Sequence, residues 1–381
     1  MVRTVACFFI IITACMLIYP AVLWAESEET GVEAFRAPLI ILPRYEGDTT
    51  KGIFVINLST GAMYLIDNAQ DSPSRLQLKK MKHNIFDALG RESVKPAKIG
   101  EVVVREIREE KGDVKTLVAI DTLTGAMAFI TDLSNDPDKG KIQQLSEKPA
   151  REYSSTGGNF ILPMHYSKTG ETNGGYLCHL TRGKCLYFNE LHKMHKKYAP
   201  VSVDKVCVIP DNVSMCEIHT GLKGARFQLL IDSVTSEMYW IEVSLDDAEK
   251  LYCREENIKL RKVFPEQAEV ATISRYAVIP IIIDNDSTWE ALIVDGGTGN
   301  LAFFNVHDYK KWDLKKTGKN IYQYLPKEVN VSRSFIGIPR ISKGFTKGGW
   351  VFDSATGSIL YIDKIDDGDD LKIQSVVIKE K

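Results

Sequence analysis

The side chains best suited to metal chemistry in this sequence gather in its middle third. Four of the seven histidines lie between positions 165 and 195. Among them, His192-x-x-His195 has a spacing that could place two imidazole nitrogens on one metal ion, since imidazole is a common ligand for zinc, copper and nickel. We therefore predict His192 and His195 as candidate metal ligands, and a metal ion is the one candidate cofactor. The alternative is that this lysine-rich stretch is a solvated strand or loop.

Five cysteines lie beyond the apolar N-terminus, and their positions suggest two disulfides. Cys178 and Cys185 flank a predicted hairpin turn, so we expect them to face each other across the hairpin, where a disulfide is feasible. Cys207 and Cys216 bracket the next turn and form the second predicted bridge. Packed free thiols are the alternative. Cys253 is then left over, to be buried, reactive or intermolecular.

Arg275 and Arg333 are candidate ligands for an anion. Each follows a serine and stands at the predicted start of a strand that would line the centre of the molecule. An arginine at the mouth of a central channel can hold a carboxylate or phosphate through two parallel hydrogen bonds. The alternative is that these guanidinium groups tie neighbouring sheets together.

Motifs of common hydrolases and nucleotide-binding enzymes do not occur in the sequence. There is no G-x-S-x-G, no H-E-x-x-H, no Walker loop and no C-x-x-C-H haem attachment. Enzymes built from repeated β-sheets often assemble a site from scattered residues. The lack of these motifs therefore does not exclude catalysis.

A sequence unit that recurs six times positions these residues. The units align on a turn residue, which is glycine in five of the six units. Four positions earlier stands a polar residue, one position earlier usually a threonine, and four positions later a large apolar residue. The turn residues are Gly61, Gly125, Gly183, Ser236, Gly299 and Gly357; the polar residues are Asn57, Asp121, His179, Asp232, Asp295 and Asp353; the large residues are Leu65, Phe129, Tyr187, Trp240, Phe303 and Tyr361.

Each aligned position has a physical reason. A short polar side chain can accept hydrogen bonds from the backbone N–H groups of the turn that follows it. Glycine supplies the positive φ that a tight hairpin requires. The large residue returns on the next strand, where it can fill the layer between neighbouring sheets. Six such hairpins in register are a strong signal of a repeat fold.

Each unit also has an apolar strand before the hairpin and a more polar strand after it. This gradient is expected when the first strand lies at the centre of a β-propeller and the fourth faces solvent. Successive turn residues are about 59 residues apart on average. The sequence therefore predicts an all-β fold, a six-bladed β-propeller of four-stranded blades.

Six units of this length would fill the chain after residue 25, so we expect residues 26–381 to form a single propeller domain. The approximate blades are residues 34–95, 96–150, 151–200, 201–268, 269–328 and 329–381.

Residues 1–25 are predicted to be a secretory signal peptide. Arg3 precedes a long apolar run, and Ala25 precedes an abrupt switch to acidic residues. An uncleaved membrane anchor and lipidation at Cys15 are the alternatives. Either alternative would tie the protein to a membrane through its N-terminus. We expect a periplasmic or secreted protein.

The charge balance argues against nucleic acid as a partner. Residues 1–25 contain one arginine and no acidic residue, so the remaining chain carries 47 basic and 50 acidic residues. This near balance gives no electrostatic reason to expect a polyanion. The expected partners are another protein of the cell envelope or a small ligand.

The D-x-x-T-G hairpin with its large residue resembles the blade repeat of the quinoprotein (PQQ-type) propellers. The resemblance covers all six units, and the tryptophan usual at the last position of that repeat is present as Trp240. Quinone-dependent dehydrogenases of the family have eight blades and a pair of adjacent cysteines. This chain has six units and no adjacent cysteines. The same repeat family includes a non-catalytic scaffold lipoprotein of outer-membrane assembly.

Three functions are compatible with this sequence. The first is a non-catalytic exported propeller that acts as an interaction or ligand-binding scaffold in the cell envelope. The second is an enzyme, a lyase or hydrolase, with its site at the mouth of the propeller channel. The third is a metal- or redox-linked binding protein. The complete use of the chain by repeats favours the scaffold.

Overall fold

The computed structural model describes most of the chain beyond residue 34. The described residues are 35, 37–67, 69–91, 95–98, 100–108, 113–133, 139–145, 159–165, 172–179, 184–189, 198–205, 213–218, 225–244, 250–260, 263–264, 275–284, 287–308, 311–326, 334–365 and 370–380. Between residues 159 and 228 the structure describes the backbone of these residues and only a few of their side chains. Within these described ranges, no helix is long and apolar enough to cross a membrane.

The described chain is almost entirely β-structure. In chain order the strands are β1 (Leu39–Glu46), β2 (Thr49–Asn57), β3 (Ala62–Asp67), β4 (Arg75–Asn84), β5 (Val102–Arg108), β6 (Val114–Asp121), β7 (Met127–Thr131), β8 (Lys141–Gln144), β9 (Asn159–His165), β10 (Thr172–His179), β11 (Lys184–Asn189), β12 (Tyr198–Lys205), β13 (Val213–Ile218), β14 (Ala225–Asp232), β15 (Glu237–Ser244), β16 (Lys250–Lys259), β17 (Tyr276–Asp284), β18 (Ser287–Asp295), β19 (Asn300–Asp308), β20 (Lys311–Asn320), β21 (Phe335–Ser342), β22 (Phe345–Asp353), β23 (Ser358–Asp363), β24 (Lys372–Ser375) and β25 (Val377–Glu380). Short helices follow two of the strands, α2 (Ile85–Leu89) after β4 and the 3-10 helix η8 (Ile321–Tyr324) after β20.

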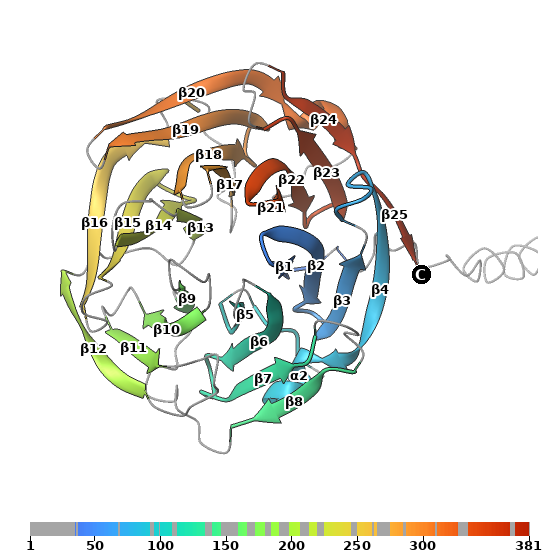
Figure 1. The fold of residues 1–381 in the computed structure, drawn as a ribbon, viewed down its shortest axis with the longest axis vertical. Helices are drawn as coiled ribbons and strands as arrows, with labels where there is room; N and C mark the ends of the chain where they lie inside the picture. Colours follow the sequence, from blue (N-terminus) through green and yellow to red (C-terminus); the bar gives the residue numbers. More distant parts are fainter. Residues whose placement is uncertain are drawn as a thin grey trace, which may run out of the picture.

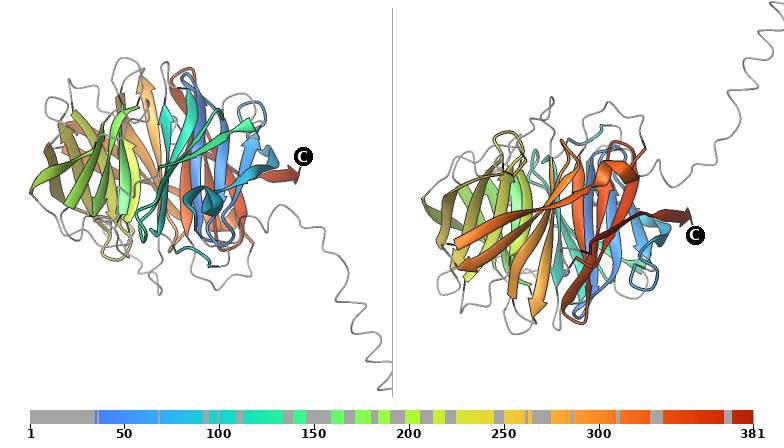
Figure 2. Two further views of the ribbon diagram at one scale, coloured as in Figure 1. Left: turned by 90° about the horizontal axis from the view of Figure 1, so that it is seen from below. Right: turned by 90° about the horizontal axis from the view of Figure 1, so that it is seen from above.

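Consecutive strands pair antiparallel in groups of four, which we call units. Among the described residues these are unit 1 (β1–β4), unit 2 (β5–β8), unit 3 (β9–β12), unit 4 (β13–β16), unit 5 (β17–β20) and unit 6 (β21–β24). The units follow one another around a common centre, with the first strand of each innermost and the fourth outermost (Figure 1). The views at right angles show the units standing side by side as twisted sheets (Figure 2). The arrangement is propeller-like.

Both faces of the units are apolar because each face packs on a neighbour. On β2, Ile53 and Val55 pack in a core cluster with unit 6, and Phe54 and Ile56 pack in a cluster with unit 2. All four side chains are fully buried. A strand buried on both faces has a continuous apolar run, whereas a strand with one wet face alternates. The core is therefore divided into layers between successive units.

The aligned hairpins have the geometry that their sequence predicts. In unit 2, Asp121 Oδ1 accepts hydrogen bonds from the backbone N–H groups of Leu123 at 2.8 Å and Thr124 at 3.0 Å. Gly125 has a φ of +74°, and its N–H donates to the Asp121 carbonyl at 2.8 Å. Trp240 fills the layer between units 4 and 5, where its ring lies 5.9 Å from that of Trp312. The roles predicted for the aspartate, the glycine and the large residue are confirmed in these units.

A bulge in the first hairpin of a unit creates a tie to the next unit. In unit 5 the β17–β18 register shifts between Ile281 and Ile282. Thr346 of unit 6 reaches this point: its hydroxyl donates to the Pro280 carbonyl at 3.1 Å and accepts from the Ile282 N–H at 3.0 Å. The threonine is 1% exposed. A single hydroxyl thus bonds two backbone groups at the interruption of the ladder.

The same tie joins unit 1 to unit 6. Thr50 on β2 donates to the Pro339 carbonyl at 3.2 Å and accepts from the Ile341 N–H at 2.9 Å. Trp350 of unit 6 adds a hydrogen bond from its indole N–H to the Pro73 carbonyl of unit 1 at 2.8 Å. Units 6 and 1 therefore share a hydroxyl tie of the same kind as the one between units 5 and 6.

Candidate functional site

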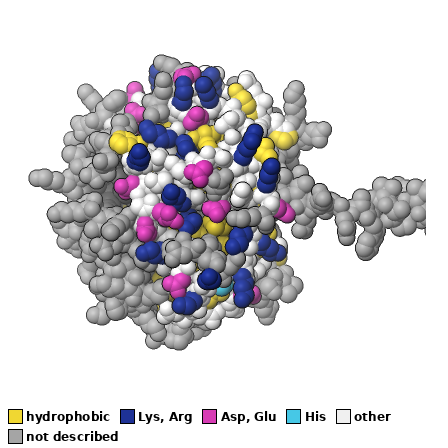
Figure 3. Space-filling view, turned by 45° about the vertical axis from the view of Figure 1, so that its right-hand side comes forward, with side chains coloured by type: hydrophobic (Ala, Val, Ile, Leu, Met, Phe, Trp, Pro, Cys, Tyr) yellow, Lys and Arg dark blue, Asp and Glu magenta, His cyan; other side chains and the backbone are white. Residues whose placement is uncertain are grey.

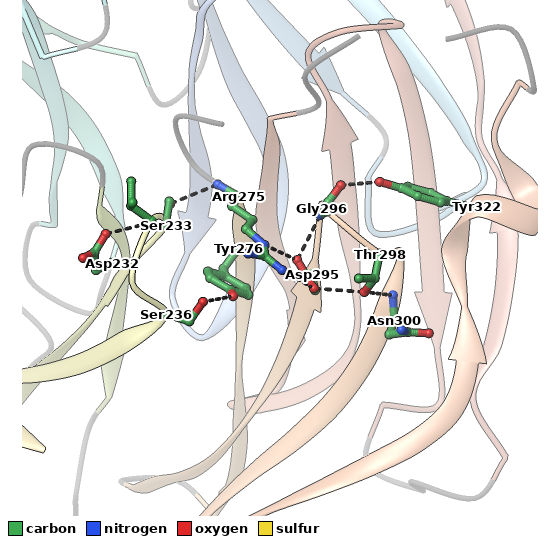
Figure 4. Close-up of polar contacts among 12 residues, drawn as sticks. Asp232, Ser233, Ser236, Arg275, Tyr276, Asp295, Gly296, Thr298, Asn300 and Tyr322 are labelled. Carbon is green, nitrogen blue, oxygen red and sulfur yellow. Dashed lines mark hydrogen bonds and ion pairs between the residues drawn. The ribbon is translucent and has the colours of Figure 1, made fainter. Parts of the chain in front are cut away.

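Arg275 is the predicted site residue whose surroundings the structure describes. It stands directly before β17, and its side chain points to Asp295 at the end of β18 (Figure 4). Its Nε donates to Asp295 Oδ1 at 2.6 Å, and its Nη2 donates to Asp295 Oδ2 at 2.9 Å. Both residues are buried, with Arg275 6% and Asp295 0% exposed. The guanidinium is held in a bidentate, charge-assisted pair.

The Asp295 carboxylate also holds the turn that follows it. Oδ1 accepts from the Gly297 N–H at 2.9 Å, and Oδ2 accepts from the Thr298 hydroxyl at 2.9 Å. Burial lowers the pKa of the Arg275 guanidinium, but the hydrogen bonds and the charge of Asp295 outweigh it and hold that pKa above its ordinary value. The pair fixes the start of β17 to the turn. Binding of an anion by Arg275 stays a prediction, and such an anion would compete with this carboxylate.

The start of β17 is also tied to unit 4. The Arg275 N–H donates to Ser233 Oγ at 3.1 Å, and the hydroxyl groups of Ser236 and Tyr276 lie 2.7 Å apart (Figure 4). Both serines belong to the hairpin turn of unit 4. The Arg275 guanidinium thus pairs within its own unit, while its backbone N–H and the Tyr276 hydroxyl make the contacts to unit 4.

Arg333, the second predicted anion ligand, lies outside the described residues. Its offset of 20 residues from the aspartate of its unit equals that of Arg275. The backbone hydrogen bonds give a different correspondence. The Gly296 N–H donates to the Arg275 carbonyl, whereas in unit 6 the Ser354 N–H donates to the Ser334 carbonyl. Ser334 is thus the structural counterpart of Arg275.

In unit 2 the counterpart of Arg275 is Glu101, whose carbonyl accepts from the Thr122 N–H at 2.8 Å. The guanidinium near the turn aspartate comes from elsewhere in the chain. Arg91, just after α2, donates to Glu101 Oε2 at 2.7 Å and lies 3.6 Å from Asp121 Oδ2. Burial raises the pKa of Glu101, but Arg91 outweighs it and holds that pKa below its ordinary value. An acid replaces the arginine at this position, and Arg91 lies between that acid and the turn aspartate.

The backbone register places Cys178 on β10 directly opposite Cys185 on β11. The structure describes the backbone of both residues and not their side chains, so the disulfide between them stays a prediction. Cys216 lies on β13 opposite Leu229, and Cys253 lies on β16 opposite Ile241.

Three further predicted residues, Cys207, His192 and His195, lie outside the described residues. Within the described part of the chain, no three side chains of His, Cys, Asp or Glu are grouped as a metal site would require. The predicted histidine ligands are not among those residues, and metal binding stays a prediction.

A capping asparagine that recurs at the end of two outer strands was not predicted from the sequence. Asn84 at the end of β4 and Asn320 at the end of β20 cap the helices that follow. Each side chain accepts a hydrogen bond from the backbone N–H two residues later, that of Phe86 and of Tyr322. Each asparagine also donates to a carbonyl of the hairpin turn of its own unit. The signal was present as Asn-Ile-aromatic about 20 residues after the turn glycine. It could have been found by extending the alignment.

Apolar side chains are exposed at two of the hairpin turns. Leu123 in unit 2 and Val234 in unit 4 occupy the same position, two residues after the aspartate, and are 39% and 44% exposed. Elsewhere acidic and basic side chains are interspersed over the described surface in the view that Figure 3 gives, in keeping with the near-neutral composition. The turns of units 2 and 4 thus present apolar groups to solvent.

No family model matches the sequence, and a comparison with curated proteins finds no match. Solved structures give distant likenesses. A periplasmic gluconolactonase, PpgL, of Pseudomonas aeruginosa has 12% identity and a TM-score of 0.44, over 86% of this chain and 83% of that chain. Apo AztD from Citrobacter koseri has 10% identity and a TM-score of 0.43, over 88% and 86%. The α-L-arabinofuranosidase Arb93A from Fusarium graminearum has 9% identity and a TM-score of 0.44, over 89% and 94%.

Proposed function

We propose that this chain is a closed six-bladed β-propeller that acts as a non-catalytic interaction scaffold in the cell envelope. In this proposal the six units are the blades, and unit 6 closes the ring against unit 1. The shared core and the two hydrogen bonds of Thr50 support this closure. Residues 1–25 are the signal peptide that exports the protein.

The observation that carries the scaffold function is the pattern of engaged and exposed groups at the hairpin turns. The buried acids there are used by their own turns, as Asp121 and Asp295 are, and the Arg275 guanidinium is paired with Asp295. The turns of units 2 and 4 each also present one large apolar side chain to solvent, Leu123 and Val234. Exposed apolar groups mark a protein-interaction site when one partner covers them together, so the proposed partner contacts the turns of both units.

The test begins with an envelope protein that is recovered with the purified propeller and identified. This partner is then purified, and its affinity for the propeller is measured. The double variant Leu123→Ser/Val234→Ser is expected to weaken binding of this partner at least about tenfold, because apolar contact area is lost. Ala355→Ser, at the same turn position of unit 6, is the matched control and should leave binding unchanged. Equal binding by all three proteins would contradict the scaffold role of these turns. Turnover of a sugar-like or peptide-like compound would support the enzyme instead.

Export is tested separately by the intact mass of the protein purified from its own cells. Cleavage after Ala25 predicts a mature chain that begins at Glu26. A chain that begins at Cys15 with added acyl mass would replace this proposal by a lipoprotein, and an uncleaved chain would replace it by an anchor.

A further inference from the structure

A fifth strand covers the outer edge of unit 1. β25 pairs in parallel with β4, from Val377 opposite Arg75 to Glu380 opposite Leu78. A single residue, Val376, connects it to β24 of unit 6. Figures 1 and 2 show β25 leaving unit 6 and lying along the outside of β4. Unit 1 is thus completed by a strand from the far end of the chain.

The backbone holds β25 more than its side chains do. Val377 is 54% exposed, the last two residues of the strand are exposed, and only Ile378 and the preceding Val376 pack against the core between units 6 and 1. The strand beneath it is different, because Leu76 and Leu78 of β4 are buried in that core. β4 is therefore held by its own buried side chains. β25 depends mainly on main-chain pairing, which any extended segment can reproduce.

Parallel pairing at an outer strand occurs at a second, independent place. β12 of unit 3 pairs in parallel with β16 of unit 4, with Ser202 opposite Lys250 and Val203 opposite Leu251. β12 and β16 are each the fourth strand of their own unit, so this pair joins two units, and it shows that an outer edge here is compatible with a parallel partner. An open strand edge is where peptides add to a sheet in protein recognition.

We propose that the outer edge of β4 is a strand-addition site, which β25 fills in cis and which takes an extended segment of a partner protein when β25 is displaced. The chemistry of β25 defines that segment. It has a β-branched apolar residue at the position of Ile378, residues that tolerate solvent on either side, and no proline where the backbone pairs with β4. The inference rests on the proposed scaffold function and names one surface for it.

The test uses the full chain and a fluorescein-labelled peptide, Val-Val-Ile-Lys-Glu, followed by fluorescence anisotropy. Ile378→Asp weakens the docking of β25 because a carboxylate cannot pack against the core. Arg75→Cys/Val377→Cys, a register pair that can be oxidised to a disulfide, locks β25 in place. We expect Ile378→Asp to bind the peptide at least about tenfold more tightly than the wild type and the locked protein to bind none. The peptide Val-Val-Ile-Pro-Glu, which keeps the isoleucine but lacks the N–H at the position of Lys379, is the control and should not bind.

Circular dichroism checks that each variant is folded, and Lys379→Pro, which removes a strand N–H without touching the core, replaces Ile378→Asp if the latter unfolds. Equal binding by all proteins, or no binding to the weakened variant at up to about 1 mM peptide, would overturn the proposal. A concentration-dependent dimer of the weakened variant would also overturn it, by assigning the edge to a second copy. A partner that is lost in Leu123→Ser/Val234→Ser but kept by the locked protein would leave the scaffold function standing and remove this edge as its site.

Discussion

At the scale of single residues, polar groups in this protein hold adjoining strands and units together. The Asp295 carboxylate accepts hydrogen bonds from one arginine and from two groups of its own turn. Ser236 and Tyr276 connect two units through their hydroxyl groups. Buried charges and hydroxyl groups of this kind are stable only when they are paired. Arg275, the candidate ligand whose side chain the structure describes, is paired with Asp295.

Ser236 is the turn residue that departs from glycine, and its substitution tests this view. It has a φ of +62° and is fully buried. In an otherwise unchanged protein, Ser236→Gly should relieve about 1 kcal/mol of backbone strain but lose a buried hydrogen bond worth about 1–3 kcal/mol, so the net effect is destabilising or small. In a Tyr276→Phe background, where that bond is already absent, Ser236→Gly should stabilise by about 1 kcal/mol. Urea unfolding of the four proteins measures both values. The same effect of Ser236→Gly in both backgrounds would show that the two hydroxyl groups are not coupled.

Tyr361 gives a prediction for alkaline pH. Burial raises the pKa of its phenol to about 12; Arg340, which donates to its oxygen at 3.1 Å, opposes this shift, and Asp363 adds to it. Since the pKa is about 10 in an unfolded chain, the stability due to the protonated phenol is full below pH 10 and is lost as the pH rises from about 10 to about 12. The loss should reach about 2–3 kcal/mol. Free energies of unfolding between pH 9 and 11.5 should fall more steeply for the wild type than for Tyr361→Phe, and parallel pH profiles would contradict the assignment.

At the scale of elements, the sequence predicted the hairpins that recur in every unit. It did not predict the strand register in which individual units differ. The turn alignment located the hairpins because aspartate, threonine and glycine act within a few residues of one another, as at Asp121. The partner of Arg275 was not predictable, since it depends on which backbone groups pair across β17 and β18. The offset of Arg333 matched by sequence, yet the register made Ser334 the counterpart. One bulge changes such a correspondence, and a bulge leaves no local signal in a strand of apolar residues.

The extra strand was unpredictable for the same physical reason. By sequence, the segment that forms β25 looks like the end of the last unit. No local sequence signal indicates that it pairs with β4, about 300 residues earlier in the chain. Long-range pairing of two strands is decided by the arrangement of the units around the centre. The candidate metal and disulfide residues of unit 3 stay predictions, because their side chains are outside the described residues.

At the scale of the whole molecule, the question is whether the contact between units 6 and 1 equals that between consecutive units. Thr346 and Thr50 allow a matched comparison, since each hydroxyl makes the same two bonds to a bulged inner strand and each is fully buried. Thr346 ties units that are consecutive in the chain. Thr50 ties the two ends of the series, so its bonds exist only if the ring is closed in solution.

If the ring is closed as proposed, Thr50→Val and Thr346→Val should destabilise the protein equally. Each change keeps the shape of the side chain but removes two buried hydrogen bonds, which should cost about 1–3 kcal/mol. In a closed ring every unit has two neighbours, so both variants should still unfold in one transition, with the same midpoint by tryptophan fluorescence and by circular dichroism. If unit 6 did not close on unit 1, Thr50→Val would cost nothing measurable while Thr346→Val kept its full cost. Urea unfolding of the two variants decides between an open series of units and a closed one, because local packing is matched and only the position of the seam differs.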